Sequence, residues 1–140
     1  MKQCLDTVYK RRDKLKKVTI TLLIIVVLGI IYLIMFFNTN SIIREVEDVM
    51  RGNVDSSVTE GTPLQRYNYN DVYKNAVVNV NITRLFTFHN FFDGYMWVKY
   101  SVETVKNDND IFPSSSNIIS RWKIHRKNGK WEIVEISEAP

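Results

Sequence analysis

The sequence predicts an α+β protein in which one N-terminal transmembrane helix precedes a helix packed on a curved antiparallel sheet of about four strands. Three observations predict this class. Residues 18–37 form an uncharged apolar run, an amphipathic segment follows it, and the second half of the chain alternates between apolar and polar residues. A chain of 140 residues has room for one folded domain and one appendage.

The apolar run is the appendage. Residues 18–37 contain no charged side chain, and as a helix they span about 30 Å, the thickness of the hydrocarbon core of a bilayer. A single segment in lipid must satisfy its own backbone hydrogen bonds, which a helix does and a lone strand does not. We therefore expect a transmembrane helix at 18–37.

Two alternatives compete with this interpretation. A buried helix of a soluble protein normally has a polar face, whereas only Thr19, Thr21 and Tyr32 are polar here. A cleaved signal peptide usually has an apolar region of about 7–15 residues and a small-residue cleavage site. The run is longer than that, and residues 36–40 offer no such site. The sequence favours an uncleaved signal anchor.

Basic residues are concentrated before the apolar run. Residues 1–17 contain seven Lys and Arg against two Asp, whereas residues 38–140 contain twelve Lys and Arg against thirteen Asp and Glu. The positive-inside rule predicts a cytoplasmic tail at 1–17 and an extracytoplasmic domain at 38–140, in a single-pass protein of the cell membrane. We expect the tail to attract anionic lipid headgroups. The nearly neutral domain does not predict nucleic-acid binding.

A helix is predicted directly after the membrane segment. Ser41 is expected to cap it and Gly52 to end it. Its apolar face consists of Ile42, Val46, Val49 and Met50. Residues 52–63 are polar with two glycines and predict a loop, and a short second helix is expected near 70–75.

Four strands are predicted, at residues 76–89, 95–106, 117–127 and 130–137. In the first strand the apolar face is expected to hold Ala76, Val78, Val80, Ile82, Phe86 and Phe88, and the polar face Asn79, Asn81, Thr83, Thr87 and His89. Arg84 interrupts the apolar face, so we expect it near a bend or at the sheet margin.

The last two strands are predicted to form a hairpin. Asn128 and Gly129 lie between alternating segments, which is the strongest short-range hairpin signal. A two-residue loop pairs Lys127 with Lys130. The same register sets Ile124 opposite Ile133, Arg126 opposite Trp131 and His125 opposite Glu132.

The hairpin also carries a resemblance. The segments RWKI at 121–124, RKNGKWEIV at 126–134 and GYMWVKY at 94–100 resemble the closing strands of the nuclear transport factor two-like (NTF2-like, cystatin-like cone) superfamily. That cone usually has two or three helices before its sheet, whereas this chain clearly shows one, so a shallow cone is expected.

The resemblance implies either an enzyme or a non-catalytic membrane-anchored module. The second group is similar to inner-membrane proteins of bacterial type IV secretion and conjugation systems, which have a short cytoplasmic tail, one span and an exported cone. The richness of the chain in Asn, Lys and Ile is typical of AT-rich bacterial genomes.

Catalytic and metal sites are not predicted. The ionisable side chains that could serve in acid–base catalysis fall in turns or on the polar phase of strands, where we expect solvated charges: Asp71, His89, Asp93, Glu103 and His125. Two histidines and no cysteine beyond Cys4 do not predict a zinc site. We expect neither an enzyme nor a bound cofactor.

The aromatic residues supply the two candidate sites. Tyr95 and Trp97 share a phase opposite to that of Met96 and are predicted to form an interaction patch if exposed. Tyr100 and Trp122 are the candidate pocket. The favoured function is a membrane-tethered protein-interaction or assembly module, with an unidentified protein partner, as a component of a conjugation or secretion complex. The alternative is an extracytoplasmic ligand-binding or sensor module with an enclosed pocket.

Overall fold

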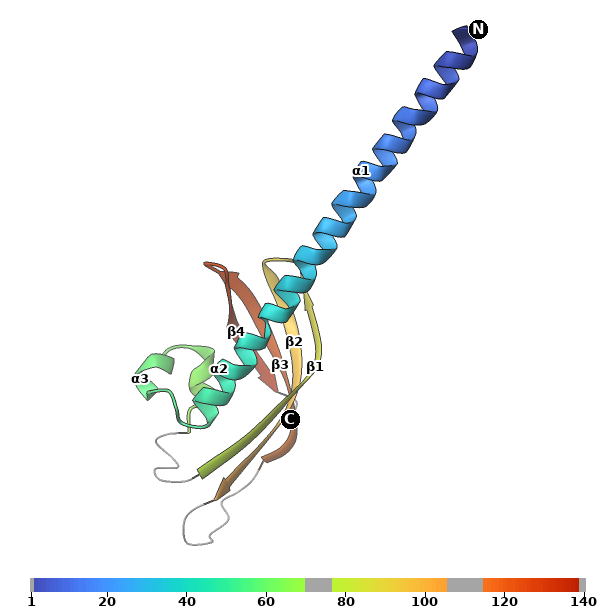
Figure 1. Ribbon diagram of the computed structural model, residues 1–140. Helices are drawn as coiled ribbons and strands as arrows, with labels where there is room; N and C mark the ends of the chain where they lie inside the picture. Colours follow the sequence, from blue (N-terminus) through green and yellow to red (C-terminus); the bar gives the residue numbers. More distant parts are fainter. Residues whose placement is uncertain (1, 70–76, 106–114, 139–140) are drawn as a thin grey trace. The chain divides into compact units, whose positions relative to one another are not determined.

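The computed structural model describes residues 2–69, 77–105 and 115–138 (Figure 1). The chain divides into two compact units, Met1–Met35 and Phe36–Pro140. The first is a single helix and the second is an α+β domain. The predicted fold class is confirmed.

Helix α1 spans Lys2–Asn38. Within the described residues it supplies the one stretch that is long and apolar enough to cross a membrane, as a membrane anchor or a signal sequence. Two polar side chains of the apolar run make hydrogen bonds within the helix. The hydroxyls of Thr19 and Thr21 donate to the carbonyls of Leu15 and Lys17, each at 3.0 Å, so neither hydroxyl needs water.

Helix α2 spans Asn40–Met50 and buries the predicted face of Ile42, Val46, Val49 and Met50. The predicted cap at Ser41 was wrong. Thr39 is the N-cap residue, and Ser41 lies in the first turn, where its hydroxyl donates to the carbonyl of Asn38 at 2.8 Å. Gly52 follows the helix with a φ of 76°, a conformation that glycine adopts without strain and that ends helices.

The predicted loop at 52–63 contains a helical turn. Helix α3 spans Ser56–Thr59, and the carboxylate of its N-cap residue Asp55 accepts a hydrogen bond from the Ser57 amide at 2.9 Å. A 3₁₀ helix, η1, then spans Pro63–Tyr67. Local capping by Asp55 explains why this polar segment is more ordered than its composition predicted. The second helix predicted near 70–75 lies outside the described residues.

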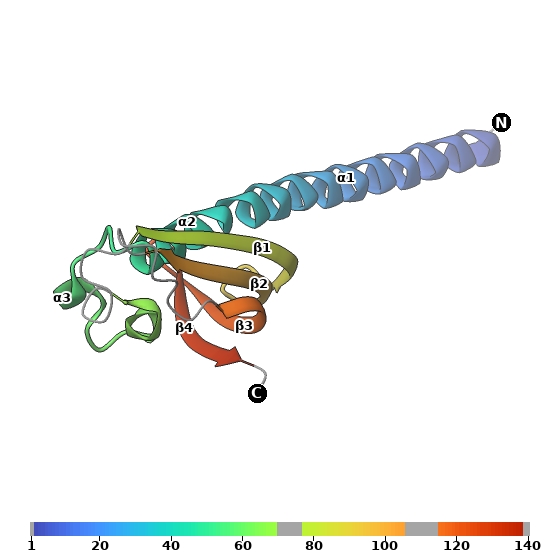
Figure 2. The ribbon, with the colours of Figure 1, turned by 90° about the horizontal axis from the view of Figure 1, so that it is seen from below.

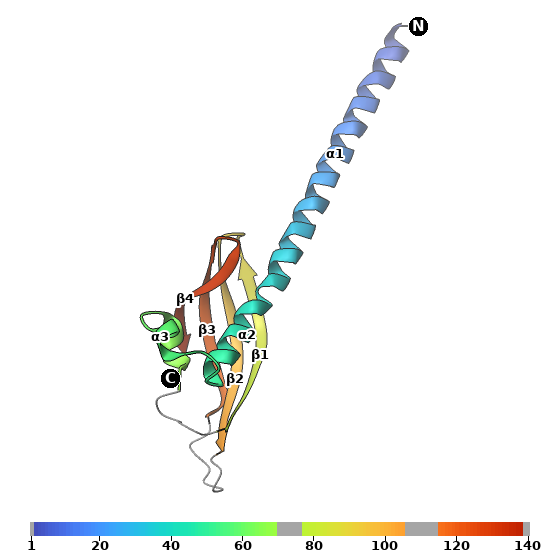
Figure 3. The same cartoon turned by 60° about the vertical axis from the view of Figure 1, so that its left-hand side comes forward.

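The sheet has four antiparallel strands in the order β1-β2-β3-β4. The strands are β1 (Val77–His89), β2 (Asp93–Val105), β3 (Ser115–Lys127) and β4 (Lys130–Glu138). The predicted register of the closing hairpin is confirmed. Figures 2 and 3 show α2 lying across one face of this sheet.

A β-bulge in β1 reverses the predicted phase of its second half. Arg84 pairs with Val98 and Phe86 with Trp97, so Leu85 is an extra residue. Because side chains alternate with a period of two, one extra residue moves every later side chain to the other face. Phe86 and Phe88 are therefore exposed, and Thr87 and His89 are buried. The opposite assignment from the sequence was wrong, whereas the bend expected at Arg84 is confirmed.

The core lies between α2 and the inner face of the sheet. Its sheet side consists mainly of fully buried side chains on β2 and β3, namely Met96, Val98, Trp122 and Ile124. Two polar contacts fix the direction of α2 along β1: Arg84 Nη1 donates to Thr39 Oγ1 at 3.1 Å, and Arg51 Nη2 donates to the Val80 carbonyl at 3.2 Å. The start of α2 thus lies beside Arg84 and its end beside Val80.

We predict that Gly94→Ala destabilises the domain. Gly94 pairs with His89, and a Cβ at this position would overlap with the Phe88 carbonyl oxygen and lie 2.7 Å from the His89 Cβ. Because the Phe88 oxygen belongs to the backbone, it cannot move aside as a flexible side chain could. The strand must shift instead, which costs about 1–3 kcal/mol or more. Thermal unfolding of the full chain in detergent, followed by tryptophan fluorescence, should show a fall in Tm of about 4 °C or more.

The matched control is Gly29→Ala, since nothing lies within 4 Å of a Cβ added there. A Gly94→Ala protein with the wild-type Tm would contradict the close approach of the two strands.

Candidate functional site

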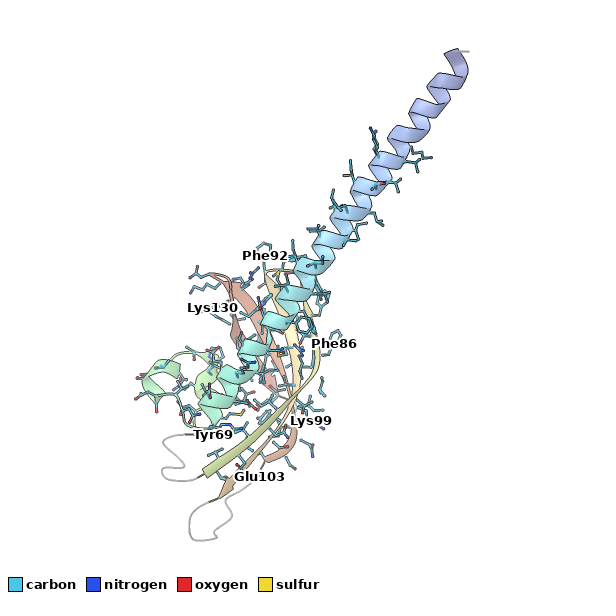
Figure 4. All side chains as sticks on the ribbon, in the orientation of Figure 1. Tyr69, Phe86, Phe92, Lys99, Glu103 and Lys130 are labelled. Carbon is cyan, nitrogen blue, oxygen red and sulfur yellow. The ribbon has the colours of Figure 1, made fainter. Side chains whose placement is uncertain are left out.

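The outer face of the sheet, opposite α2, carries a cluster of large apolar side chains. The cluster is called here the outer patch and consists of Phe86, Phe88, Tyr95, Trp97 and Ile119. Phe86 and Phe88 are 59% and 56% exposed, and Tyr95 is 39% exposed. Phe86, labelled in Figure 4, contributes from β1, while Tyr95 and Trp97 contribute from β2.

Three rings of the outer patch contact one another, Phe86 with Trp97 across strands and Tyr95 with Trp97 along β2. The Trp97 ring centre lies 5.6 Å from that of Phe86 and 6.0 Å from that of Tyr95. These are ordinary separations for tilted aromatic pairs. Tyr95 and Trp97 are therefore brought together as the sequence predicted, and the bulge adds Phe86 to them.

Basic side chains border the outer patch on β2 and β3. Arg121 pairs with Trp97, and its guanidinium carbon lies 5.6 Å from the centre of the Tyr95 ring. Lys123 pairs with Tyr95, and Lys99 with Ile119. An open hollow of about 250 Å³ lies next to the patch and is lined by Trp97, Ile119, Arg121, Ser137 and Glu138. The patch thus combines exposed rings with positive charge.

Tyr100 and Trp122 lie on the other, inner face and are buried in the core. Tyr67 of η1 packs against both, with ring centres 5.6 Å from Tyr100 and 6.1 Å from Trp122. The indole Nε1 of Trp122 donates to the Tyr67 hydroxyl at 3.0 Å. The Tyr67 ring therefore occupies the space beside the two residues of the candidate pocket.

Glu138 links this aromatic group to the end of β4. The hydroxyls of Tyr67 and Tyr100 donate to Glu138 Oε1 at 3.1 and 2.8 Å, and Arg66 pairs with Oε2 at 2.7 Å. Burial raises the pKa of both tyrosines, which keeps them protonated as donors. These contacts account for Tyr100 and Trp122 as parts of a buried hydrogen-bonded cluster.

The ionisable candidates are dispersed. Glu103 is exposed, as expected, and Asp71 lies outside the described residues. His125 pairs with Glu132 in the sheet register, as predicted, and its Nδ1 lies within hydrogen-bond distance of Asp93 Oδ1, at 2.7 Å on the surface. His89 was predicted to be solvated, which was wrong, because the bulge turns it into the core against Trp131, with ring centres 5.2 Å apart.

Metal ligands are not clustered in the part of the chain that the structure describes, where no group of three or more His, Cys, Asp or Glu side chains could hold an ion. Sequence reasoning missed Tyr67 and Glu138, which no local pattern connects because they are 71 residues apart. It also missed Phe86 and Phe88 as surface residues.

Comparisons of the chain with protein-family models, curated proteins and solved structures found no match. The resemblance to the NTF2-like superfamily therefore stays a prediction.

We predict that Tyr67→Phe destabilises the domain by about 1–3 kcal/mol. The change removes the acceptor of the buried Trp122 N–H and one donor to Glu138, and a buried polar group without a partner is costly. Tyr95→Phe is the matched control. Tyr95 is exposed, so loss of its hydroxyl should change the free energy of unfolding by less than about 0.5 kcal/mol. Chemical denaturation of the full chain measures both, and equal effects would contradict the cluster.

We also predict that acid destabilises the domain through His89. Burial and the positive charge of Arg126 lower the pKa of His89. Below the ordinary histidine pKa of about 6.5, His89 is therefore protonated in the unfolded chain before it is protonated in the folded chain, and protonation favours unfolding. The stabilisation is complete above pH 6.5 and is lost as the pH falls toward the lowered pKa.

The test uses a His125→Gln background, in which His89 is the one remaining histidine. The free energy of unfolding should fall between pH 7 and pH 5, and adding His89→Gln should flatten that slope. An unchanged slope would contradict a neutral, buried His89.

Proposed function

We propose that this chain is a membrane-tethered extracytoplasmic protein-interaction module. In this proposal α1 holds the domain at the cell membrane, and the outer patch binds a protein partner. The observation that carries the proposal is the patch itself, since four large rings on the solvent face of a sheet are unusual without a partner to cover them.

The membrane tether is supported by α1 and by charge. The apolar length of the helix and its internally bonded threonine hydroxyls suit a bilayer. Seven Lys and Arg precede the apolar run, which favours retention of the N-terminus in the cytoplasm and export of the domain.

The chemistry of the partner follows from the surroundings of the patch. Tyrosine, tryptophan and arginine are the residues most often found at the energetic centres of protein interfaces, and the patch combines Tyr95, Trp97 and Arg121. Lys99 and Lys123 add positive charge on either side. The patch therefore fits a protein surface with apolar side chains next to Asp and Glu.

We further propose that this module acts non-catalytically, in an assembly such as a bacterial conjugation or secretion complex. The proposal is supported by the antiparallel sheet with a helix on one face, which this chain would share with the NTF2-like cone, and that cone usually has two or three helices before its sheet. This part rests on analogy of fold, which by itself does not determine function.

We predict that a photoreactive residue at Ile119 in native membranes crosslinks to a discrete protein. Ile119 is exposed at the edge of the outer patch. Tyr95→Ala/Trp97→Ala should reduce the adduct at least about 30-fold, as expected when hot-spot residues worth about 2 kcal/mol are removed. Trp97 is half-buried, so its loss could also destabilise the domain. Phe86→Thr/Phe88→Thr provides an independent variant, because it changes only exposed side chains of β1.

The matched control places the photoreactive residue at Val58, which is exposed on α3. An adduct at Ile119 that survives both sets of substitutions, or equal adducts at the two positions, would contradict docking at the patch. Reproducible absence of any protein adduct at Ile119 would contradict the proposed function.

A further inference from the structure

Two hairpin tips lie together at one end of the sheet. The β1–β2 tip is residues 90–92, and the β3–β4 tip is residues 128–129. They are connected by a hydrogen bond in which the Arg126 amide donates to the Phe92 carbonyl at 2.7 Å. Figure 4 labels Phe92 and Lys130 at this end and Glu103 at the opposite end. The two tips and their flanking residues are called here the tip edge.

The tip edge combines an exposed ring with concentrated positive charge. Phe92 is 67% exposed. Residues 123–132 contain four Lys and Arg against one Glu, whereas the whole domain from residue 38 onward has one more acidic than basic residue. Positive charge is thus in excess around the β3–β4 tip, while Asp93 adds one negative charge beside the β1–β2 tip.

Two lysines in the hairpin oppose each other directly. Lys127 pairs with Lys130 across the two-residue turn, and both are exposed. Like charges facing each other across strands are destabilising. Glu45 of α2 interacts electrostatically with Lys130 and also with Glu132, so it offsets only part of this charge. An external anion between the lysines would relieve their repulsion.

Strand β1 connects the tip edge to the end of the apolar run. Arg84 is held at the start of α2 by its bond to Thr39, and its guanidinium carbon lies 4.4 Å from the centre of the Phe36 ring. Phe36 and Phe37 are the last residues of the apolar run. Strand β1 passes Thr39 at Arg84 and continues five residues to His89, which is about 16 Å of strand.

The tip edge thus projects beyond the start of α2, where the chain joins the apolar run. The last residue of β1, His89, lies about 16 Å along the strand from Arg84, and this separation stays the same however the domain turns about the junction. The headgroup layer on each side of a bilayer is about 5–7 Å thick. The tip edge can therefore reach this layer if residues 18–37 cross the membrane.

We propose that the tip edge contacts the surface of the membrane that anchors the chain, with Phe92 entering the headgroup region and Lys127 and Lys130 binding anionic phospholipid headgroups. The inference rests on the proposed membrane anchoring by α1. In this inference the tips bind lipid and the outer patch binds a protein. Lipid contact at the tips would restrict the orientation of the domain at the membrane and leave the outer patch accessible to its partner.

The test reconstitutes the full chain, with Cys4→Ser, in nanodiscs. A single fluorescent label is attached at Phe92→Cys, at Glu103→Cys or at Ile24→Cys, and quenching by lipids carrying a nitroxide on the headgroup or the acyl chain is measured. Glu103 is the matched control because it is an exposed strand residue at the far end of the sheet. Ile24 lies in the apolar run and reports insertion.

The proposal predicts headgroup quenching at position 92 and not at position 103 in bilayers of phosphatidylcholine with phosphatidylglycerol. Lys127→Gln/Lys130→Gln should weaken this contact about 30-fold, since each lysine near an anionic surface contributes a factor of about five. Bilayers of phosphatidylcholine alone, which carry no net negative charge, should weaken the contact at position 92 to a similar extent.

Acyl-chain quenching at position 24 without headgroup quenching at position 92 overturns the inference and leaves the membrane anchor standing. Absence of quenching at position 24 overturns the anchor itself. Quenching at position 92 that is the same with and without anionic lipid, and with and without the lysine substitutions, overturns the binding of anionic headgroups by Lys127 and Lys130. A protein crosslink at position 92 without lipid quenching assigns the tip edge to a protein and overturns the inference as well.

Discussion

The bulge at Leu85 is the constraint on which the surface of the domain depends. A regular β1 would place Phe86 and Phe88 under α2 and leave Thr87 and His89 in water. With one extra residue, the two phenylalanines join Tyr95 and Trp97 on the outer face, and His89 packs against Trp131. His89 therefore contributes to the core, and Phe86 and Phe88 do not.

Arg84, immediately before the bulge, connects the sheet to the chain junction. Its guanidinium bonds Thr39 at the N-cap of α2 and stacks over Phe36. Because the apolar run ends at Phe37, this one side chain joins the middle of β1 to the end of that run. The bulge and Arg84 together determine which face of the sheet is exposed and which end lies close to the junction.

The regular parts of the fold could be predicted because their signals are local. Alternation identified the four strands, and Asn128-Gly129 predicted the register of the closing hairpin from the turn to the pair Ile124–Ile133, beyond which a bulge shifts it by one residue. The bulge left a weaker signal: Arg84 is polar in the apolar phase and Leu85 is apolar in the polar phase. Two consecutive violations indicate a change of phase, but the bulky residues that follow fit either face.

Tertiary contacts account for what the sequence could not predict. The cluster of Tyr67 and Glu138 joins residues 71 positions apart, and nothing near Tyr67 indicates that its ring lies beside Tyr100 and Trp122. The outer patch was half predicted, since Tyr95 and Trp97 follow from the phase of β2, whereas Phe86 depends on the bulge. The function itself rests on surface chemistry, which becomes visible only once the faces are assigned.

The most direct test of this account is the chemical accessibility of consecutive β1 positions. Single cysteines at 86, 87 and 88 would be introduced in the purified full chain with Cys4→Ser, and their rates of reaction with a charged maleimide compared. The account predicts fast reaction at 86 and 88 and slow reaction at 87. Fast reaction at 87 with protection at 86 and 88 would show that β1 has no bulge, and the outer patch would lose its basis.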